Sequence, residues 1–166
     1  TLSNFEVTQG YKDITDISAT VKFKIKAGQK IGDFETDENT YILAWTTTPW
    51  TLPGNAALAV GKDIEYALVG SEGARYALAK DKIADVFKDK EAEIMRTFGG
   101  SDLVGLSYEP LFSYYAEKED LENRENGWKI YAGDFVTTID GVGVVHIAPA
   151  FGEDDMRMGK EEKLPF

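Results

Sequence analysis

The apolar residues of this chain are gathered into short runs of strand length, bounded by glycine, proline or clusters of polar residues. Such runs are typical of β-strands, because a surface helix needs a longer stripe with apolar residues three and four apart. Residues 19–26 alternate apolar and polar side chains, and residues 41–45 are apolar throughout. The pattern therefore predicts a strand-rich fold with both half-buried and fully buried strands.

The expected strands cover residues 19–26, 41–45, 56–60, 64–69, 74–79, 94–98, 128–132, 135–138 and 141–148. The polar, glycine-containing residues 70–73 predict a hairpin turn between two of these strands. Residues 28–39 are expected to form a loop and residues 52–55 a turn. Residues 101–127 lack a regular pattern and are interpreted as a solvated excursion.

Two short helices are expected beside the strands. Asp81 is expected to cap a helix over residues 81–90. A second helix over residues 152–163 has acids in its first turn and lysines in its last, as the helix dipole favours. No internal repeat is visible, so residues 1–166 are predicted to form one domain. The predicted class is α+β, a strand-rich, barrel-like fold with short flanking helices.

The net charge limits the partners of this chain. Lys and Arg number 18 and Asp and Glu 29, which gives a formal charge of −11. A domain this acidic repels a phosphate backbone at long range, which argues against free-standing, non-specific nucleic-acid binding. A short single-stranded end delivered by another part of a larger protein is compatible with this charge.

Cysteine is absent and histidine occurs once, as His146. Disulfides, thiolate metal sites and a two-histidine zinc site within the chain are therefore excluded. No apolar stretch approaches the roughly 18 residues of a membrane span, and no secretory signal is expected at the start. Together these features favour a cytoplasmic protein without membrane contact.

The first candidate site is the run Trp45-Thr46-Thr47-Thr48-Pro49-Trp50. An extended backbone here would place Thr46 and Thr48 on one side and Thr47 on the other, with three hydroxyls at a strand end. These hydroxyls could grip a ribose or a carboxyl group. Threonine is also simply a good strand residue, and the threonines alone favour this second explanation.

The second candidate site follows a buried strand, in the segment HIAPAFGEDD over residues 146–155. A lone histidine at a strand end is more often a satisfied core residue than a functional one. Glu153, Asp154 and Asp155 could be first-turn acids of a helix or could hold a metal, although they lack the spacing of a calcium loop. A strand, a loop and an acidic helix start this close together make a plausible cleft. Neither segment contains a nucleophile–base pair or a glycine-rich phosphate loop.

The two segments together resemble a known family. Residues 45–55, WTTTPWTLPGN, strongly resemble the threonine-rich segment of the editing domain inserted in class I isoleucyl-tRNA synthetases. Residues 143–155, GVVHIAPAFGEDD, resemble the second signature of the same domain. Residues 11–13 and 21–23 resemble the stretch that leads into the insertion. The two long motifs stand in the family's order, and the resemblance spans residues 11–166, although residues 100–127 match least.

Further details separate this chain from related enzymes. Valyl and leucyl enzymes of this type characteristically carry an arginine before the proline of the threonine-rich segment, whereas Thr48 precedes Pro49 here. The signatures of the synthetic active site, of the HIGH and KMSKS types, are absent from this sequence. The resemblance therefore implies an editing domain cut out of a larger isoleucyl-type ligase, one that does not activate amino acids by itself.

The implied activity is hydrolysis of the ester that links valine to isoleucine tRNA. Such editing is needed because one methylene group changes the free energy of binding to a hydrophobic pocket by only about 1–3 kcal/mol. The standard example of this limit is the discrimination of isoleucine from valine. The implied partners are the 3′ aminoacyl-adenosine end of tRNA and the remaining domains of the synthetase, with the protein a monomer. The domain itself would need no cofactor, whereas the parent ligase would use ATP and Mg²⁺.

The resemblance also implies residue roles. Asp155 corresponds to the acid that anchors the substrate α-ammonium group, and it is the residue assigned as catalytic. His146 corresponds to the residue that lines the side-chain and ester end of the pocket. Trp45 and Phe151 lie where bulk could exclude isoleucine. The hydroxyl-bearing wall that holds the amino acid and the terminal adenosine is formed by Thr46, Thr47 and Thr48.

Three alternatives stay open on the sequence. The chain could bind the aminoacyl end or the free amino acid without hydrolysing anything. It could be the editing domain of a valyl- or leucyl-type synthetase. It could also be a metal-dependent hydrolase built on Glu153, Asp154 and Asp155.

Overall fold

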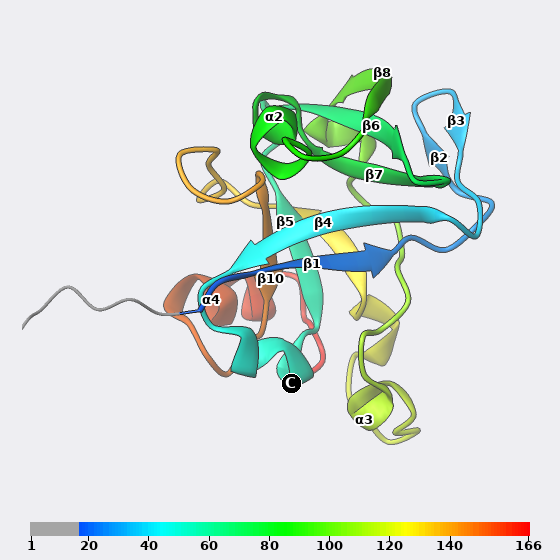
Figure 1. Ribbon diagram of the computed structural model, residues 1–166. Helices are drawn as coiled ribbons and strands as arrows, with labels where there is room; N and C mark the ends of the chain where they lie inside the picture. The colour runs from blue at the N-terminus through cyan, green and yellow to red at the C-terminus, as the bar shows by residue number, and fades with distance from the viewer. Residues whose placement is uncertain (1–16) are drawn as a thin grey trace, which may run out of the picture.

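The computed structural model describes residues 17–166, and most of their regular structure is strand (Figure 1). Residues 11–13, one part of the family resemblance, lie outside the described residues. The strands form a large sheet, a smaller sheet and a short hairpin. Within the described residues no helix is long and apolar enough to cross a membrane.

The large sheet has five strands in the order β1-β4-β7-β6-β8. Its pairs are antiparallel except for β4 and β7, which run parallel. The predicted hairpin is confirmed, since β6 and β7 pair across a turn in which Glu72 and Gly73 have φ angles of 51° and 79°. The strands are β1 (Ala19–Lys24), β4 (Thr40–Thr46), β6 (Glu65–Ser71), β7 (Ala74–Ala79) and β8 (Glu93–Gly99).

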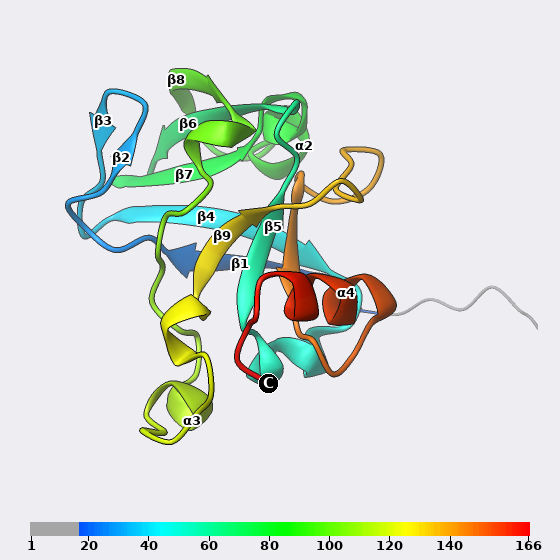
Figure 2. The same ribbon diagram turned by 180° about the vertical axis from the view of Figure 1, so that it is seen from behind.

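The smaller sheet has three strands in the order β10-β5-β9, and Figure 2 shows it from the side opposite to Figure 1. Strand β5 (Ala57–Val60) is buried at every position, as expected for a central strand. It pairs antiparallel with β10 (Val144–Ile147) and parallel with β9 (Lys129–Ala132). The short hairpin is formed by β2 (Lys30–Ile31) and β3 (Phe34–Glu35), inside the segment expected to be a loop.

The two sheets are joined by the segment over residues 107–109. The amide of Lys26 donates to the carbonyl of Ser107, and the amide of Glu109 donates to the carbonyl of Lys24, both just beside or within β1. The amide of Tyr108 donates to the carbonyl of Trp128, next to β9. Strand β10 in turn lies against β4. The strand-rich α+β class is confirmed, but between residues 17 and 166 the sheets do not close into one barrel.

The main core lies between the two sheets. In β1 the predicted alternation is confirmed, since Phe23 is fully buried while Thr20 and Lys22 are exposed. Phe23 meets Tyr108 edge to face at 5.4 Å between ring centroids. Leu103, Leu106 and Tyr108 belong to this core, so the interpretation of residues 101–127 as a wholly solvated excursion is wrong. Only the part around α3 (Ser113–Ala116) stands away from the sheets (Figures 1 and 2).

The helix expected over residues 81–90 is wrong in length and in its cap. The 3₁₀ turn η2 (Lys80–Lys82) leads into α2 (Ile83–Val86), and Asp81 makes no side-chain capping bond. The residues after Phe87 are polar, so no further apolar side chain could bury a longer helix against the sheet.

The strand expected over residues 135–138 is also wrong, because this stretch is irregular loop. The strand expected over 141–148 begins only at Val144, since Gly141 and Gly143 adopt φ angles of 77° and 74°. These left-handed conformations turn the chain instead of extending it. The loop between β9 and β10 passes close to Trp45 near the end of β4, since a Cβ added at Gly141 would lie 3.0 Å from the Trp45 ring.

Further short helices surround the strands. The helix expected over 152–163 is observed as α4 (Glu153–Glu161), with Glu153, Asp154 and Asp155 in its first turn. The turn expected over 52–55 lies within the 3₁₀ helix η1 (Pro49–Gly54). Two more 3₁₀ turns are η3 (Gly100–Asp102) and η4 (Arg124–Asn126).

Candidate functional site

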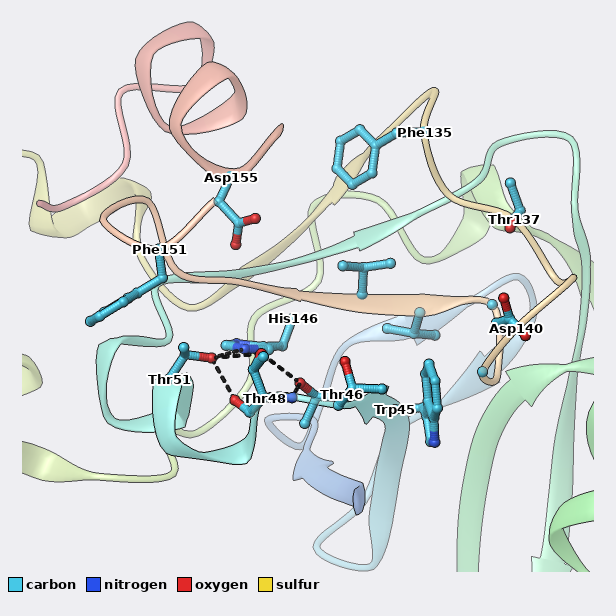
Figure 3. Close-up of a pocket in the computed structure, with 15 residues that line it drawn as sticks. Trp45, Thr46, Thr48, Thr51, Phe135, Thr137, Asp140, His146, Phe151 and Asp155 are labelled. Atoms are coloured by element: carbon cyan, nitrogen blue, oxygen red, sulfur yellow. Dashed lines mark hydrogen bonds between the residues drawn. The ribbon is translucent and has the colours of Figure 1, made fainter. Parts of the chain in front are cut away.

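A pocket of about 270 Å³ opens where three parts of the chain meet (Figure 3). These parts are the end of β4 with η1, the end of β10 with the start of α4, and the loop between β9 and β10. The structure brings to this pocket every residue to which the family resemblance assigns a role, namely Trp45, Thr46, Thr47, Thr48, His146, Phe151 and Asp155.

Strand pairing explains why the two sequence motifs meet. Ala57 of β5 stands opposite Ile147 of β10, and the amide of Ala56 donates to the carbonyl of Ile147. The threonine-rich motif runs directly into β5 through η1, and the second motif runs directly out of β10. The pairing of these strands therefore sets the end of one motif beside the middle of the other.

The threonines form a chain of hydroxyls along one wall. The amide of Thr48 donates to Oγ1 of Thr46 at 3.0 Å, which turns the backbone as β4 ends. The hydroxyls of Thr46 and Thr48 lie 3.3 Å apart. Thr46 is buried, whereas Thr47 and Thr48 are exposed. The last two therefore offer hydroxyls that a ligand can reach.

His146 is buried beneath these threonines. Its Nε2 lies 2.8 Å from Oγ1 of Thr51, a residue of η1. Burial lowers the pKa of the imidazole from its ordinary value of 6.5, and the negative charge of Asp155 opposes this shift. His146 is therefore neutral at pH 7.

Asp155 lies at the other side of His146, in the first turn of α4. Its Oδ1 accepts a hydrogen bond of 2.6 Å from the amide of Ala148, which follows β10. The side chain is half-buried and its carboxylate borders the pocket (Figure 3). This carboxylate can receive a cationic group from the pocket while it holds the end of β10 in place.

The two neighbouring acids lie elsewhere. Glu153 and Asp154 are exposed and do not line the pocket, and Asp154 pairs with Arg157 at 3.0 Å. Among residues 17–166 no three acidic or histidine side chains are arranged to hold a metal ion. The alternative of a metal-dependent hydrolase built on these three acids therefore has no support in the geometry.

The two aromatic residues differ in placement. Trp45 lies at the end of the pocket away from Asp155, and a Cβ added at Gly141 would be 3.0 Å from its ring (Figure 3). Phe151 is 62% exposed and lies against Gly54. Trp45 can therefore limit the space available to a ligand at that end, whereas Phe151 is a solvent-exposed part of the lining. Trp50, the second tryptophan of the motif, is exposed and does not line the pocket.

Several lining residues were missed by the sequence analysis. Phe135, Thr137 and Asp140 line the pocket from the loop between β9 and β10. Phe135 and Thr137 were missed because residues 135–138 have the composition of a strand, and Asp140 belongs to neither sequence motif. Thr51 stands within the threonine-rich motif, and its place in that run was the signal that could have found it.

Similarity to known sequences identifies the family. Over 164 residues the chain is 46% identical to the isoleucine–tRNA ligase of Clostridium tetani, covering 99% of this chain and 14% of the ligase. Over 164 residues it is 44% identical to that of Thermoplasma volcanium, with the same coverage. The chain belongs to the isoleucine–tRNA ligase family. It spans about 14% of the length of these curated relatives and so corresponds to one segment of the ligase. No protein-family model matches it.

Solved structures show the fold of this isoleucine–tRNA ligase segment. It superposes on GlLeuRS-CP1 with a TM-score of 0.68 and 15% identity, over 87% of this chain and 60% of the other. A cytosolic leucyl-tRNA synthetase editing domain of P. falciparum gives a TM-score of 0.56 and 13% identity, over 80% and 49%. The ligase segment thus has the fold of these editing domains.

Proposed function

We propose that this segment is an editing domain that hydrolyses the ester between valine and isoleucine tRNA. The observation that carries the proposal is the meeting of both family motifs in one pocket, with the carboxylate of Asp155 toward one end and Trp45 toward the other. The pocket thereby offers an anchor for a cation and, at the other end, an aromatic wall that can limit the size of a side chain.

In this proposal Asp155 binds the α-ammonium group of the amino acid. A charge-assisted hydrogen bond to a half-buried carboxylate fixes both position and charge. Oδ1 already accepts from the amide of Ala148, which leaves the other carboxylate oxygen for the ligand. The hydrogen bond from Ala148 fixes the orientation of the Asp155 side chain, and the second oxygen can then orient the substrate.

The ester is cleaved by water. An aminoacyl ester is already activated, so a positioned water and donors for the developing oxyanion suffice. The reachable hydroxyls of Thr47 and Thr48 supply such donors along the wall. His146 contributes by shape and not as a charged acid, because its imidazole is neutral.

The same pocket supplies the size filter. Valine enters, and the walls formed by Trp45 and His146 exclude the additional methylene of isoleucine. Steric exclusion in this pocket multiplies the selectivity for isoleucine over valine that the synthetic site of the ligase achieves by itself.

The partners follow from this activity. The domain receives the 3′ aminoacyl-adenosine end of tRNA, while the remaining domains of the ligase hold the tRNA body, a division that fits the charge of −11 on this segment. It acts as a single copy and in the cytoplasm, where charged tRNA is made and used.

The test is a deacylation time course on isoleucine tRNA charged with valine or with isoleucine. The chain is expected to release valine and to spare isoleucine. Asp155→Asn keeps an acceptor oxygen for Ala148 but loses the charge, so valine release is expected to fall at least about tenfold. Glu153→Gln, the matched control outside the pocket, is expected to retain activity. Valine release by Asp155→Asn at the rate of the unchanged chain would contradict the assignment, and binding of charged tRNA without any release would favour a binding module.

A further inference from the structure

The contact between Thr51 and His146 has a definite direction. Both side chains are buried, with 6% and 7% of their surface exposed, and they come from η1 and β10, 95 positions apart in the chain. Oγ1 of Thr51 lies 2.8 Å from the carbonyl of Thr48 and 2.8 Å from Nε2 of His146. Which atom donates in the second contact follows from the partners available to both side chains.

A threonine hydroxyl carries one proton, and a carbonyl oxygen can only accept. Thr51 can therefore donate to the carbonyl of Thr48 and accept from Nε2 of His146, or it can donate to Nε2, which puts the proton of the neutral ring on Nδ1. The second arrangement buries an N–H that has no partner among the described residues, so we assign the first, in which Nε2 of His146 donates to Oγ1 of Thr51. A neutral imidazole has one N–H, which leaves Nδ1 unprotonated. The contact is thus not a nucleophile–base pair, because the histidine is the donor.

Nδ1 of His146 has no hydrogen-bond partner among the described residues, and it is buried. The ring is therefore held by a single polar contact, the one to Thr51 (Figure 3). Packing restricts the ring, but only this contact distinguishes one ring nitrogen from the other.

We infer that Thr51 is a positioning residue that fixes the tautomer and the orientation of His146, and thereby the shape of the wall that excludes isoleucine. The inference about specificity rests on the proposed editing function, whereas the inference about the tautomer does not. Thr51 itself touches neither the ester nor the attacking water in this assignment.

The test compares Thr51→Val, which keeps the shape without the hydroxyl, with Thr51→Ser, which keeps the hydroxyl. Thr97→Val, an exposed threonine of β8, is the matched control. Because the chain has one histidine, long-range ¹H–¹⁵N correlation of the imidazole reports only His146. The unchanged chain, Thr51→Ser and Thr97→Val are expected to show a protonated Nε2 and a lone pair on Nδ1 at neutral pH. Thr51→Val is expected to show averaged signals of both tautomers.

Deacylation supplies the second measurement. In Thr51→Val the ratio of isoleucine release to valine release is expected to rise about tenfold, which is the lower end of the discrimination that one methylene group provides. Thr51→Ser is expected to keep the ratio of the unchanged chain. A protonated Nδ1 in the unchanged chain overturns the inference, even if Thr51→Val fails to fold. So does a folded Thr51→Val with an unchanged tautomer and ratio. If no variant deacylates either tRNA, the proposed function fails, and the imidazole spectra still decide the role of Thr51.

Discussion

Gly152 and Asp155 occupy one small volume at the start of α4. A Cβ added at Gly152 would stand 2.4 Å from Oδ2 of Asp155, closer than two such atoms can approach. The backbone angles of Gly152 are extended, so alanine would be compatible with the chain there but not with the carboxylate. The position of the proposed ammonium anchor thus depends on the absence of a side chain three residues earlier.

We therefore expect Gly152→Ala to lower valine release at least about tenfold by displacing the carboxylate, although no functional group is removed. Deacylation rates and a thermal melt of the variant would be measured together. Gly99→Ala is the matched control, since a Cβ there approaches nothing closer than 4.0 Å. Full activity in Gly152→Ala would mean that the carboxylate needs no fixed position.

His146 makes the stability of the fold depend on pH. Burial places the pKa of the folded state below the ordinary value of 6.5, so the unfolded chain binds a proton that the folded chain does not. The free energy of unfolding is therefore expected to fall as the pH drops below about 6.5, by at most about 1.4 kcal/mol per pH unit. Urea unfolding between about pH 7.5 and pH 5.5 measures this slope. His146→Gln should flatten it, and equal slopes in both proteins would argue against a neutral buried imidazole.

At the scale of elements, buried hydroxyls tie the strands that carry the site. Tyr66 of β6 donates to the carbonyl of Gly143 and accepts from the amide of Gly61, so it links the large sheet to the residue that precedes β10. Burial raises the pKa of Tyr66 to about 12, which keeps this hydroxyl protonated. Tyr108 similarly donates to Asn55 at the junction of η1 and β5.

Tyr66→Phe leaves two buried backbone groups without a partner. We expect the free energy of unfolding to fall by about 1–3 kcal/mol, as is typical for an unsatisfied buried group. Denaturant unfolding would show the loss as a lower midpoint. Tyr114→Phe, on the exposed α3, should leave the midpoint unchanged, and an equal effect of both substitutions would rule out this role for the hydroxyl.

Sequence patterns correctly predicted the strands and turns that are determined by residues close together in the chain. The alternation in β1, the buried run of β4 and the hairpin turn at Gly73 each depend on neighbouring residues, and each is observed. Residues 135–138 have strand composition but no neighbouring strand to pair with, and pairing is not a local property. The site residues of the two motifs could be proposed because each motif is a continuous run of sequence. Phe135, Thr137 and Asp140 belong to no such run and reach the pocket only through the path of a loop.

At the scale of the whole molecule, the net charge of −11 opposes the approach of any nucleic acid. Salt screens this repulsion, so kcat/KM for valine-charged tRNA is expected to rise when salt is raised from about 50 to about 200 mM. Steady-state deacylation at several salt concentrations tests the sign. A steep fall, as in proteins that bind the phosphate backbone, would show that a local basic surface outweighs the net charge.

The joining of distant segments also has a kinetic consequence. The hairpin of β6 and β7 needs a loop of only a few residues, whereas β5 must find β10 across most of the second half of the chain. Contacts of high sequence separation close late and slowly, because their loop entropy is lost before they are formed. The pocket depends on that one pairing. During refolding we therefore expect hydrolytic activity to return only with the slowest phase, after most strand structure has already appeared.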